Sequence, residues 1–388
     1  MNEIFRAASE LAASDLTKEA LIKHAYNIFL LRDPSDADIA FHASKEWEHN
    51  EEFIGALVGS DEFRQLARMG HNFLLAPRMR KRVLLFGAYG NGNIGDAIQA
   101  ESLRRHLEIV RPDLEVWAYS EIPGRYPFRH DRVLPPGAFL RSPAVNQFDA
   151  IIVGGGGLLS HPHAPLFDES WQSMVAVPVV ILGVGASKPV CERSKVLLQK
   201  ASFISGRDTS SIDALKGYRD DVQLVPDPVL CDPFYQRKTI GQGKLFVIKH
   251  GTEKELVAAR QHFDPKHDAA CFIEPSLDIT VSRHFPEAVP ISSVDDLVEM
   301  IDAHHLVIST RYHGCILAIL RGKAVVGIRE QKSKELLARY AAGSRFYPSF
   351  SVMSGTDIST DGSNDRLLAD DRFALLAALN TALRTAGL

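Results

Sequence analysis

The sequence predicts an α/β protein of two Rossmann-like domains that face a central cleft, preceded by a small all-α N-terminal domain. Three observations predict this architecture. Helical periodicity dominates residues 1–75, short apolar runs alternate with helix-like stretches over residues 82–235, and a second series of that kind covers residues 241–345. Strands that alternate with helices indicate parallel, doubly wound sheets.

Size and composition narrow the class of protein. The chain has 388 residues, 45% of them hydrophobic and 24% charged, which is ordinary for a globular protein with room for two domains and an appendage. Because 44 basic residues stand against 48 acidic ones, for a formal net charge of −4, we expect no nucleic-acid partner.

Cysteine usage and hydropathy predict where the protein works. The four cysteines lie far apart without paired spacing, which indicates reduced thiols of a cytoplasmic protein and neither a disulfide framework nor a metal site. No apolar run approaches the about 18 residues that a membrane-spanning helix needs. Peripheral contact with the inner face of the plasma membrane stays open.

The elements follow in order along the chain. In the first segment, Leu21, Ala25 and Phe29 recur at helical spacing, and Asp33-Pro34 ends one helix before another begins, so we expect three or four short helices. The expected strands of the two α/β domains lie at residues 83–86, 116–119, 150–153, 179–184, 203–205 and 222–225, and then at residues 245–249, 270–273, 289–291, 306–309 and 324–328. Residues 226–243, rich in proline and glycine, separate the two series. A final amphipathic helix at residues 366–388 is expected to cross back to the first domain.

The run Ser309-Thr310-Arg311-Tyr312-His313-Gly314 carries the strongest chemical signal. It follows a buried strand, and ligands bind at the carboxyl ends of strands in open α/β sheets. In extended backbone, residues two apart point the same way, so Arg311 and His313 would face one cleft. A guanidinium suits a carboxylate or phosphate, and an imidazole moves protons near neutral pH. The alternative is an arginine ion pair beside a hydrogen-bonded surface histidine.

A glycine-rich turn at residues 90–96 follows the first strand of the α/β region. It matches the dinucleotide-binding pattern G-x-G-x-x-G, so a nicotinamide-dependent enzyme must be considered. Asp96 counts against that reading, because a carboxylate in the first helical turn would repel a pyrophosphate. Asn93 and Asp96 suit hydrogen bonds to sugar hydroxyls better. Alternatively, Asn93 caps the helix and Asp96 offsets its dipole.

Two further strand ends carry candidate residues. Gly155 and Gly156 lie in a run of four glycines whose backbone allows close approach of a ligand and whose amides can bind an oxyanion. His161 follows on the same loop, and it could be either an exposed loop residue or a catalytic residue. Arg207 lies at a strand end near a helix N-terminus and could bind an anion there, or pair with Asp208.

Taken in order, these elements resemble the polysaccharide pyruvyl transferase family. The match covers about residues 82–340 and rests on residues 92–96, residues 149–157, Arg207-Asp208, Pro226-Asp227-Pro228 and residues 309–314, with Lys332 or Lys334 at a further family position. Ala97-Ile98 and Gly314 depart from the family pattern without touching the charged groups. We expect Pro226-Asp227-Pro228 to make the backbone rigid where the chain leaves the last strand of the first domain, a geometric role.

The resemblance implies a bacterial transferase whose architecture is similar to GT-B glycosyltransferases. Members transfer the enolpyruvyl group of phosphoenolpyruvate to two hydroxyls of one sugar in exopolysaccharide biosynthesis, forming a pyruvate ketal and releasing phosphate. It also implies phosphoenolpyruvate and a saccharide acceptor, lipid-linked or not, as partners, and no cofactor or metal.

The resemblance also implies roles for the candidate residues. Arg311 and Arg207 would bind the anion, and His313 would act in acid–base catalysis. His161, Gly155 and Gly156 would complete the phosphoenolpyruvate site, while Asn93 and Asp96 would contact the acceptor or shape the cleft.

Three rival readings remain open from the sequence. The nearest is a GT-B glycosyltransferase that uses a nucleotide sugar, since the two-domain layout serves both reactions. The second is a non-catalytic saccharide-binding protein, and the third is the nicotinamide-dependent enzyme. The sequence leaves open the acceptor sugar, the oligomeric state and the role of the helical segment.

Overall fold

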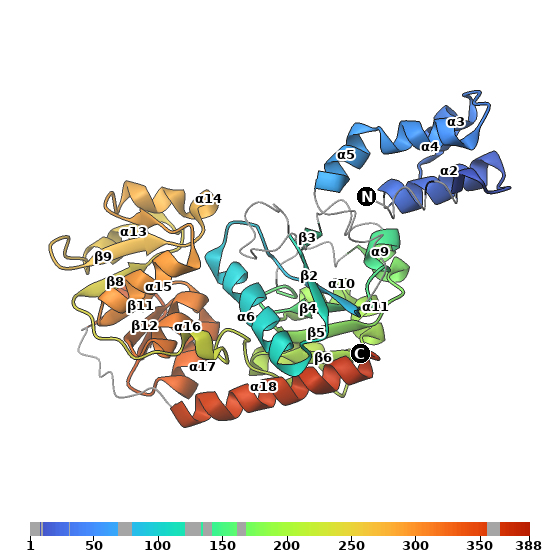
Figure 1. Ribbon diagram of the computed structural model, residues 1–388. Helices are drawn as coiled ribbons and strands as arrows, with labels where there is room; N and C mark the ends of the chain where they lie inside the picture. Colours follow the sequence, from blue (N-terminus) through green and yellow to red (C-terminus); the bar gives the residue numbers. More distant parts are fainter. Residues whose placement is uncertain are drawn as a thin grey trace.

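The computed structural model describes residues 8, 11–30, 32–68, 80–120, 133–134, 142–160, 168–354 and 365–388. These residues form two parallel β-sheets with helices around them and a separate group of helices near the N-terminus (Figure 1). The two sheets confirm the α/β fold class that the sequence predicts. Among the described helices, none combines the length and apolar character required to cross a membrane.

The first sheet has seven parallel strands in the order β3-β2-β1-β4-β5-β6-β7. Their bounds are β1 (Arg82–Phe86), β2 (Glu115–Tyr119), β3 (Val133–Leu134), β4 (Ala150–Gly154), β5 (Val179–Val184), β6 (Phe203–Gly206) and β7 (Gln223–Leu224). The strand order reverses between β1 and β4. Such a switch point opens a crevice at the carboxyl ends of the strands, where doubly wound sheets bind ligands.

The second sheet repeats this topology with six parallel strands in the order β10-β9-β8-β11-β12-β13. Their bounds are β8 (Lys244–Val247), β9 (Ala269–Phe272), β10 (Val289–Pro290), β11 (Leu306–Ser309), β12 (Ala324–Ile328) and β13 (Arg345–Tyr347). Its switch point lies between β8 and β11. The sequence analysis missed β3 and β13, which are too short to show a period of their own.

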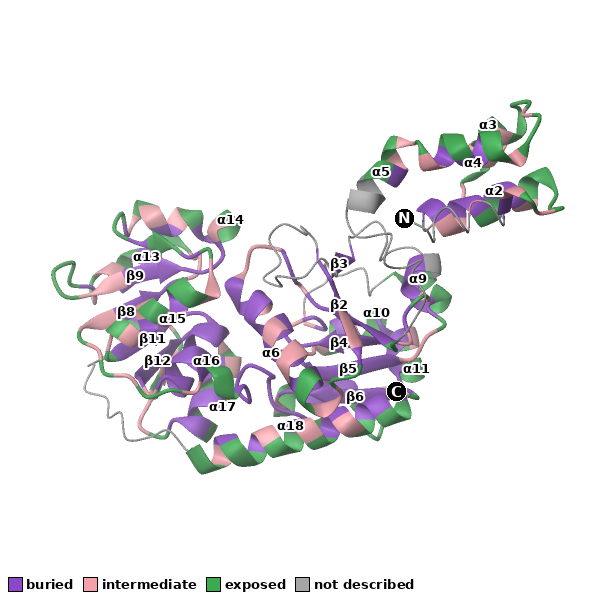
Figure 2. Ribbon diagram, viewed as in Figure 1, coloured by how far each residue is buried: buried purple, intermediate pink, exposed green. Residues whose placement is uncertain are grey.

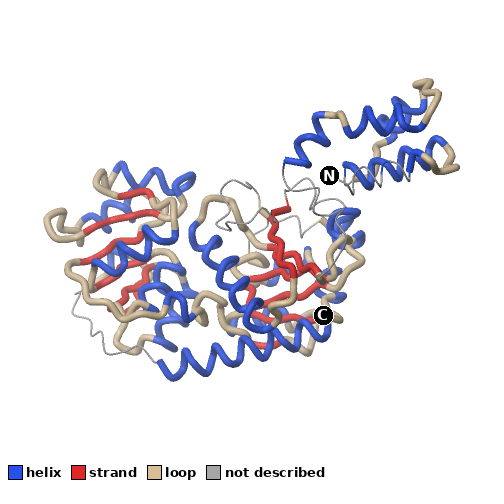
Figure 3. The backbone as a smooth tube through the Cα atoms, viewed as in Figure 1, coloured by secondary structure: helices blue, strands red, loops and turns tan. Residues whose placement is uncertain are grey.

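Helices cover both sheets (Figure 3). In the first domain they are α6 (Ile94–Val110), α8 (Ser142–Val145), α9 (Glu169–Met174), α10 (Lys188–Arg193), α11 (Lys195–Lys200) and α12 (Thr209–Leu215). After the short helix η5 (Pro233–Tyr235) come α13 (Glu253–Arg260), α14 (Pro275–Asp278), η6 (Ile279–Arg283), α15 (Val294–Ala303), α16 (Tyr312–Leu320), α17 (Gln331–Tyr340), η7 (Phe350–Val352) and α18 (Asp365–Thr385). Strands β1, β4 and β12 are buried along their whole length, and Figure 2 shows the labelled strands β4 and β12 in the colour of buried residues. Burial on both faces explains their continuous apolar sequences.

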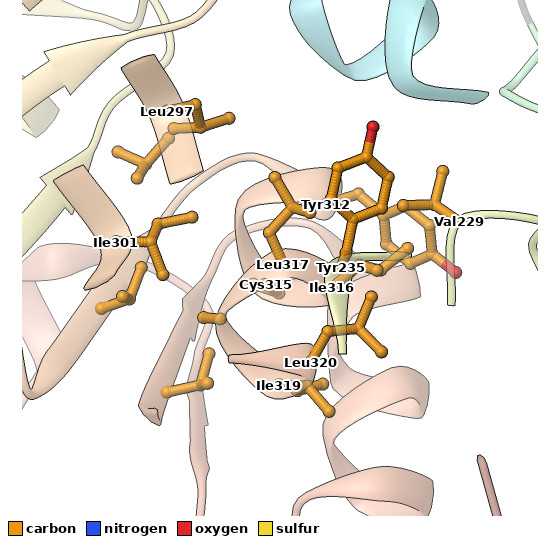
Figure 4. Close-up of a cluster of buried hydrophobic side chains, with 14 of the residues drawn as sticks. Val229, Tyr235, Leu297, Ile301, Tyr312, Cys315, Ile316, Leu317, Ile319 and Leu320 are labelled. Carbon is orange, nitrogen blue, oxygen red and sulfur yellow. The ribbon is translucent and has the colours of Figure 1, made fainter. Parts of the chain in front are cut away.

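The two α/β domains contact each other through buried apolar side chains. Ile94 and Ile98 of α6, in the first domain, belong to the buried cluster of the second domain. The amide of Ile94 also donates a hydrogen bond to the carbonyl of Ile273, with 3.0 Å between nitrogen and oxygen. Val229 and Tyr235 of the connecting segment pack on α16 in the same cluster (Figure 4). The cleft therefore has a fixed floor made by both domains.

The long C-terminal helix α18 joins the domains a second time (Figure 1). Its Leu368 packs in the cluster of the second domain, whereas Leu375, Leu379 and Leu383 are buried in the core of the first. The guanidinium of Arg372, on the same helix, donates to the carbonyl of Cys231 in the connecting segment at 2.9 Å. This helix holds the two sheets in a set relation.

The N-terminal helices form a small unit with its own apolar cluster. They are α2 (Lys18–Ala25), the π-helical turn η1 (Tyr26–Leu30), α3 (Asp36–Ala43), α4 (Asn50–Val58) and α5 (Asp61–Arg68). Leu21, Phe29 and Phe53 are among the residues buried between them. The domain boundaries drawn from the sequence stay predictions.

We expect Leu379→Ala to lower the free energy of unfolding by about 2–5 kcal/mol, because it opens a cavity where α18 packs on the first domain. Urea unfolding followed by circular dichroism measures the change. Phe373→Ala on the same helix is the matched control, since Phe373 is 77% exposed and its loss should change stability by less than about 0.5 kcal/mol. Equal effects of the two substitutions would contradict the packing described for α18.

Candidate active site

The switch points of both sheets open onto one cavity of about 370 Å³. Loops that follow β1, β4 and β6 line it from the first domain, and loops that follow β8, β9, β11 and β12 line it from the second. Its polar and charged lining residues are Asn91, Asn93, Asp96, Arg207, Lys249, His250, Glu274, Arg311, Tyr312, His313, Glu330 and Lys332. The structure thus brings Arg207, Arg311 and His313, which the sequence singles out, to a single site.

A buried carboxylate, Asp227, lies behind this cavity and links the two domains. One of its oxygens, Oδ2, accepts hydrogen bonds from the side-chain amide of Gln99 at 2.8 Å and from Nη1 of Arg207 at 3.3 Å. The other, Oδ1, accepts from the backbone amide of Val229 at 3.0 Å. Nε2 of His313 lies 3.8 Å from Oδ2, too far for a hydrogen bond but close enough for a strong charge interaction.

The partners of Asp227 keep it ionised in spite of its burial. Burial alone raises the pKa of a carboxyl group, but His313 and Arg207 lower the pKa of Asp227 to about 2. This carboxylate lies beside Nε2 of His313, and His313 itself lines the cavity. An imidazole in this position is a candidate for proton transfer to or from a ligand.

Arg207 leaves β6 and is almost wholly buried at the wall of the cavity. Its guanidinium carbon lies 4.6 Å from the centre of the Tyr312 ring, in a cation–π contact that crosses from the first domain to the second. Its Nε lies 3.6 Å from a carboxylate oxygen of Asp208. The pair with Asp208, one of the two sequence alternatives, is thus present, but Asp227 and Tyr312 also hold the side chain at the cleft.

Arg311 reaches the cavity by a route that differs from the one we expect from the sequence. The helix α16 begins at Tyr312, so Arg311 and His313 are not successive same-side residues of an extended chain. The Arg311 guanidinium binds Glu274 at 2.8 Å and also binds Asp278, which is fully buried. Arg311 therefore carries a charge that two carboxylates already offset, whereas His313 turns toward Asp227.

Two lysines add cations that do not come from the motif at residues 309–314. Nζ of Lys249 and Nζ of Lys332 lie 3.3 Å and 3.5 Å from the two carboxylate oxygens of Glu330. Burial, followed by the charge of Arg207, lowers the pKa of Lys332. Lys332 also lies 5.5 Å from the centre of the Tyr312 ring, so Arg207 and Lys332 are both near the same aromatic side chain.

A strained turn after β12 precedes Glu330. Arg329 has a φ of 70°, which is the only positive φ of a non-glycine residue in the described part of the chain. The amide of Glu330 donates to the carbonyl of Ile328 at 2.8 Å, so the chain reverses within three residues. Strain of this kind concentrates at functional sites, and here it lies next to the carboxylate that both lysines share.

The start of α6 approaches His313 across the domain boundary. Asn93 caps this helix, because its side-chain oxygen accepts from the amide of Gly95 at 2.9 Å. A Cβ atom added at Gly95 would come within 2.3 Å of Nδ1 of His313, so only glycine allows this approach. Asp96 accepts from the side-chain amide of Asn91 at 3.1 Å and faces the cavity. Asn93 therefore caps the helix and also lines the cleft.

The glycine run after β4 serves packing in a way that the sequence analysis did not foresee. Gly155 and Gly156 have φ values of 73° and 68°, and a Cβ atom on either would come within 3.0 Å of the Gln99 side chain. The amide of Gly155 already donates to the carbonyl of Leu182, so the expectation that it binds an oxyanion is wrong. Gly156 does line the cavity. The two glycines let Gln99 reach Asp227.

Two further expectations concern His161 and a metal ion. His161 lies outside the described residues, so its role stays a prediction. Among the residues that the structure describes, no group of three or more histidine, cysteine, aspartate or glutamate side chains is placed to hold a metal ion.

The positive charge at the cavity comes from both domains. Arg207 of the first domain and Lys249, Arg311 and Lys332 of the second line it. Guanidinium and ammonium groups suit carboxylate and phosphate oxygens. This arrangement fits an anionic ligand.

Several residues of the site could not be recognised from the sequence. The sequence analysis predicts a geometric role only for Asp227, and it does not identify the acidic residues Glu274 and Asp278, the amide Gln99 or the cation Lys249. For Asp227 a signal was available, because an aspartate between two prolines at a strand exit has no helix to cap. The remaining residues lie on elements that only the fold brings to the cavity.

Residues 93–333 match the polysaccharide pyruvyl transferase family. No curated protein matches the chain in sequence.

Solved structures give weaker similarities. UDP-GlcNAc 2-epimerase from Methanocaldococcus jannaschii, in complex with UDP-GlcNAc and UDP, has 10% identity and a TM-score of 0.48, covering 78% of this chain and 100% of that one. UDP-GlcNAc 2-epimerase from Neisseria meningitidis has 11% identity and a TM-score of 0.44, covering 79% and 94%. The E. coli heptosyltransferase WaaC with ADP has 10% identity and a TM-score of 0.35, covering 78% and 99%. With TM-scores below 0.5, these similarities carry no inference about the reaction of this chain.

We expect Asp227→Asn to lower the free energy of unfolding at pH 7 by about 3–5 kcal/mol, because it takes from the buried Arg207 its fully buried carboxylate partner and leaves only the more distant Asp208. The folded pKa of Asp227 lies near 2, below the about 3.9 of an unfolded aspartate, so its stabilisation is present above about pH 4 and is lost as pH falls toward 2.

The difference in the free energy of unfolding between wild type and Asp227→Asn should therefore shrink as pH falls from about 4 toward 2. Urea unfolding at a series of pH values measures this difference. Asp213→Asn, at an exposed position of α12, is the control and should show no such difference. A gap that stays constant from pH 5 to pH 2 would contradict the low pKa of Asp227.

Proposed function

Since the chain belongs to the polysaccharide pyruvyl transferase family, we propose that this transferase uses phosphoenolpyruvate as its donor and forms a cyclic pyruvate ketal on two hydroxyls of one sugar, releasing phosphate. One observation carries the proposal. Arg207 from the first domain and Arg311 and His313 from the second line one cavity. Phosphoenolpyruvate bears a carboxylate and a phosphate on adjacent atoms, so it offers several acceptor oxygens in a small volume.

Cations from both domains support binding of such an anion. Arg207 comes from the first domain, and Lys249, Arg311 and Lys332 come from the second. Arg207 and Lys332 both lie near the Tyr312 ring, 4.6 Å and 5.5 Å from its centre, so they bring two cations from the two domains to one region of the cavity. Arg311, which pairs with Glu274 and Asp278, adds a guanidinium from another strand end. Guanidinium groups suit both carboxylate and phosphate.

In the proposed reaction, His313 moves the protons. The imidazolium donates a proton to the methylene carbon of phosphoenolpyruvate, which leaves an oxocarbenium-like centre at C2. A sugar hydroxyl attacks C2 and returns its proton to the imidazole. The bond from C2 to the phosphate oxygen then breaks, the second hydroxyl attacks C2, and its proton leaves with the phosphate. Asp227 stabilises the imidazolium at each stage where it exists.

The state of the cysteines bears on the compartment in which the enzyme meets its acceptor. The four cysteines are free and buried, which fits a protein of a reducing compartment. We place the enzyme in the bacterial cytoplasm, where a lipid-linked saccharide precursor would be reached at the inner face of the plasma membrane. Phosphoenolpyruvate serves as a substrate, and the proposed steps require no cofactor.

Acceptor-dependent phosphate release tests the proposal. The purified protein is incubated with phosphoenolpyruvate and a panel of mono- and oligosaccharides, and phosphate and the ketal are followed by colorimetry and mass spectrometry. We expect one class of saccharide to release phosphate and gain the mass of a ketal. Release of nucleoside diphosphate from a nucleotide sugar, with no reaction of phosphoenolpyruvate, would instead establish a glycosyltransferase.

We expect His313→Asn to lower kcat by about 10²–10⁴-fold while the KM for phosphoenolpyruvate changes little, because the variant keeps the cations and loses the proton carrier. Arg207→Lys should mainly raise that KM, because an ammonium cannot offer the paired donors of a guanidinium. Steady-state phosphate release measures both constants. His267→Asn is the control, since His267 is exposed near the start of β9, at the opposite end of that strand. Unchanged kcat in His313→Asn would remove this residue from the mechanism.

A further inference from the structure

A second, larger hollow lies beside the central cavity, between the same two domains. It has a volume of about 1180 Å³ and is bounded by α6, by η5 and by the loops that open α14 and α15. Asn93 lines both this groove and the central cavity, so the two spaces adjoin at the start of α6. Its volume exceeds the about 300–1,000 Å³ of a site for a drug-sized ligand, so an extended ligand fits here.

An aromatic ring is held at the rim of this groove. Phe234 is 64% exposed although it is a large apolar residue. Its backbone amide donates to Asp232 at 3.0 Å, and its ring lies 4.4 Å from the guanidinium carbon of Arg105 and 5.2 Å, edge to face, from the ring of Tyr235. Because it is fixed by these contacts and still exposed, the ring offers a preformed flat surface to a ligand.

Two polar side chains line the groove beside Phe234. Tyr235 is only 2% exposed, and the guanidinium of Arg105 lies against it, with its carbon 5.1 Å from the centre of the Tyr235 ring. Hydroxyl groups both donate and accept hydrogen bonds, so they suit a lining of guanidinium and carboxylate groups. A ligand that carries hydroxyls therefore fits this groove.

The charges in the groove argue against an anionic ligand. Arg105 is paired with Glu101 and with Asp232, each at 2.8 Å, and Arg104 is paired with Glu108. Asp295, on the far side, adds another negative charge. Since the cations are matched or exceeded by carboxylates, a neutral ligand is favoured over a phosphate or a lipid headgroup.

We propose that this groove binds the neutral saccharide chain of the acceptor, with the C–H face of one sugar ring stacked on Phe234. The sugar that receives the pyruvate then lies in the central cavity, and the chain leaves past Asn93 along α6. Phe234 is in this view a specificity-determining residue that selects acceptors of two or more sugars. The inference rests on the proposed function for the identity of the acceptor, but the binding itself does not require the reaction.

Direct glycan binding tests the groove separately from catalysis. Wild-type protein, Phe234→Ala, Phe234→Trp and Phe373→Ala are applied to an array of immobilised bacterial oligosaccharides together with their terminal monosaccharides. Phe373 is the matched control because it is also exposed, at 77%, and does not line the groove. Circular dichroism and thermal unfolding check that each variant is folded.

We expect the wild type to bind at least one oligosaccharide more tightly than the matching monosaccharide. Phe234→Ala should weaken that binding by about 5–10-fold, as loss of an aromatic stacking contact does, while Phe234→Trp and Phe373→Ala stay within about twofold of wild type. In the phosphate-release assay, Phe234→Ala should raise the KM for the same oligosaccharide and leave the KM for phosphoenolpyruvate unchanged.

The outcomes separate the two proposals. Oligosaccharide binding that depends on Phe234, without phosphate release from phosphoenolpyruvate, would support the groove and overturn the proposed function. Phosphate release with equal oligosaccharide constants for wild type and Phe234→Ala would overturn the groove. If the wild type bound no oligosaccharide, or if the surface around Phe234 bound a protein partner and no saccharide, the groove proposal would be overturned as well.

Discussion

The charge of Asp227 is the interaction on which the site depends. This carboxylate is buried where the first domain passes into the connecting segment, and it binds Gln99 from α6 and Arg207 from β6 while facing His313 from α16. Pro226 and Pro228 restrict the backbone on both sides of it. A buried charge is tolerated only with partners, so each of these groups is fixed by the need to compensate the same carboxylate.

The shared topology of the two sheets explains why this carboxylate can reach both domains. Each sheet has its switch point near its centre, and each therefore directs loops from several strand ends to one place. The contact of Ile94 with the second domain and the passage of α18 across both domains hold the two loop sets against each other. The resulting cavity draws Arg207 from one domain and Arg311 and His313 from the other, so neither domain contains a complete site.

Much of the fold could be predicted from the sequence, because buried parallel strands are continuous apolar runs and their spacing shows the helices between them. The basic and imidazole groups could also be placed, since Arg207, Arg311 and His313 follow such strands. The orientation of Arg311 and His313 could not, because the sequence does not show whether a helix begins at Tyr312 or one turn later. The acidic partners were missed for a related reason. Glu274 and Asp278 approach Arg311 from another strand end, and only tertiary packing determines that approach.

The acidic partners also bear on how the site can exist without its ligand. Each cation at the cavity has a carboxylate neighbour: Asp227 for Arg207, Glu274 and Asp278 for Arg311, and Glu330 for Lys249 and Lys332. Four uncompensated cations in a small, largely buried space would repel one another and drive the domains apart. Pairing avoids this, and it also limits how tightly an anion is held.

That limit matters for the reaction that we propose, because it ends with a free phosphate. A site with surplus positive charge would bind this product as firmly as the substrate, and such uniform binding does not raise kcat. Here each cation already has a carboxylate partner, so an anion must fit beside Asp227, Glu274 or Glu330 to reach it. In the proposed reaction, the acidic residues that could not be predicted from the sequence would thus lower the affinity for phosphate and allow the product to leave.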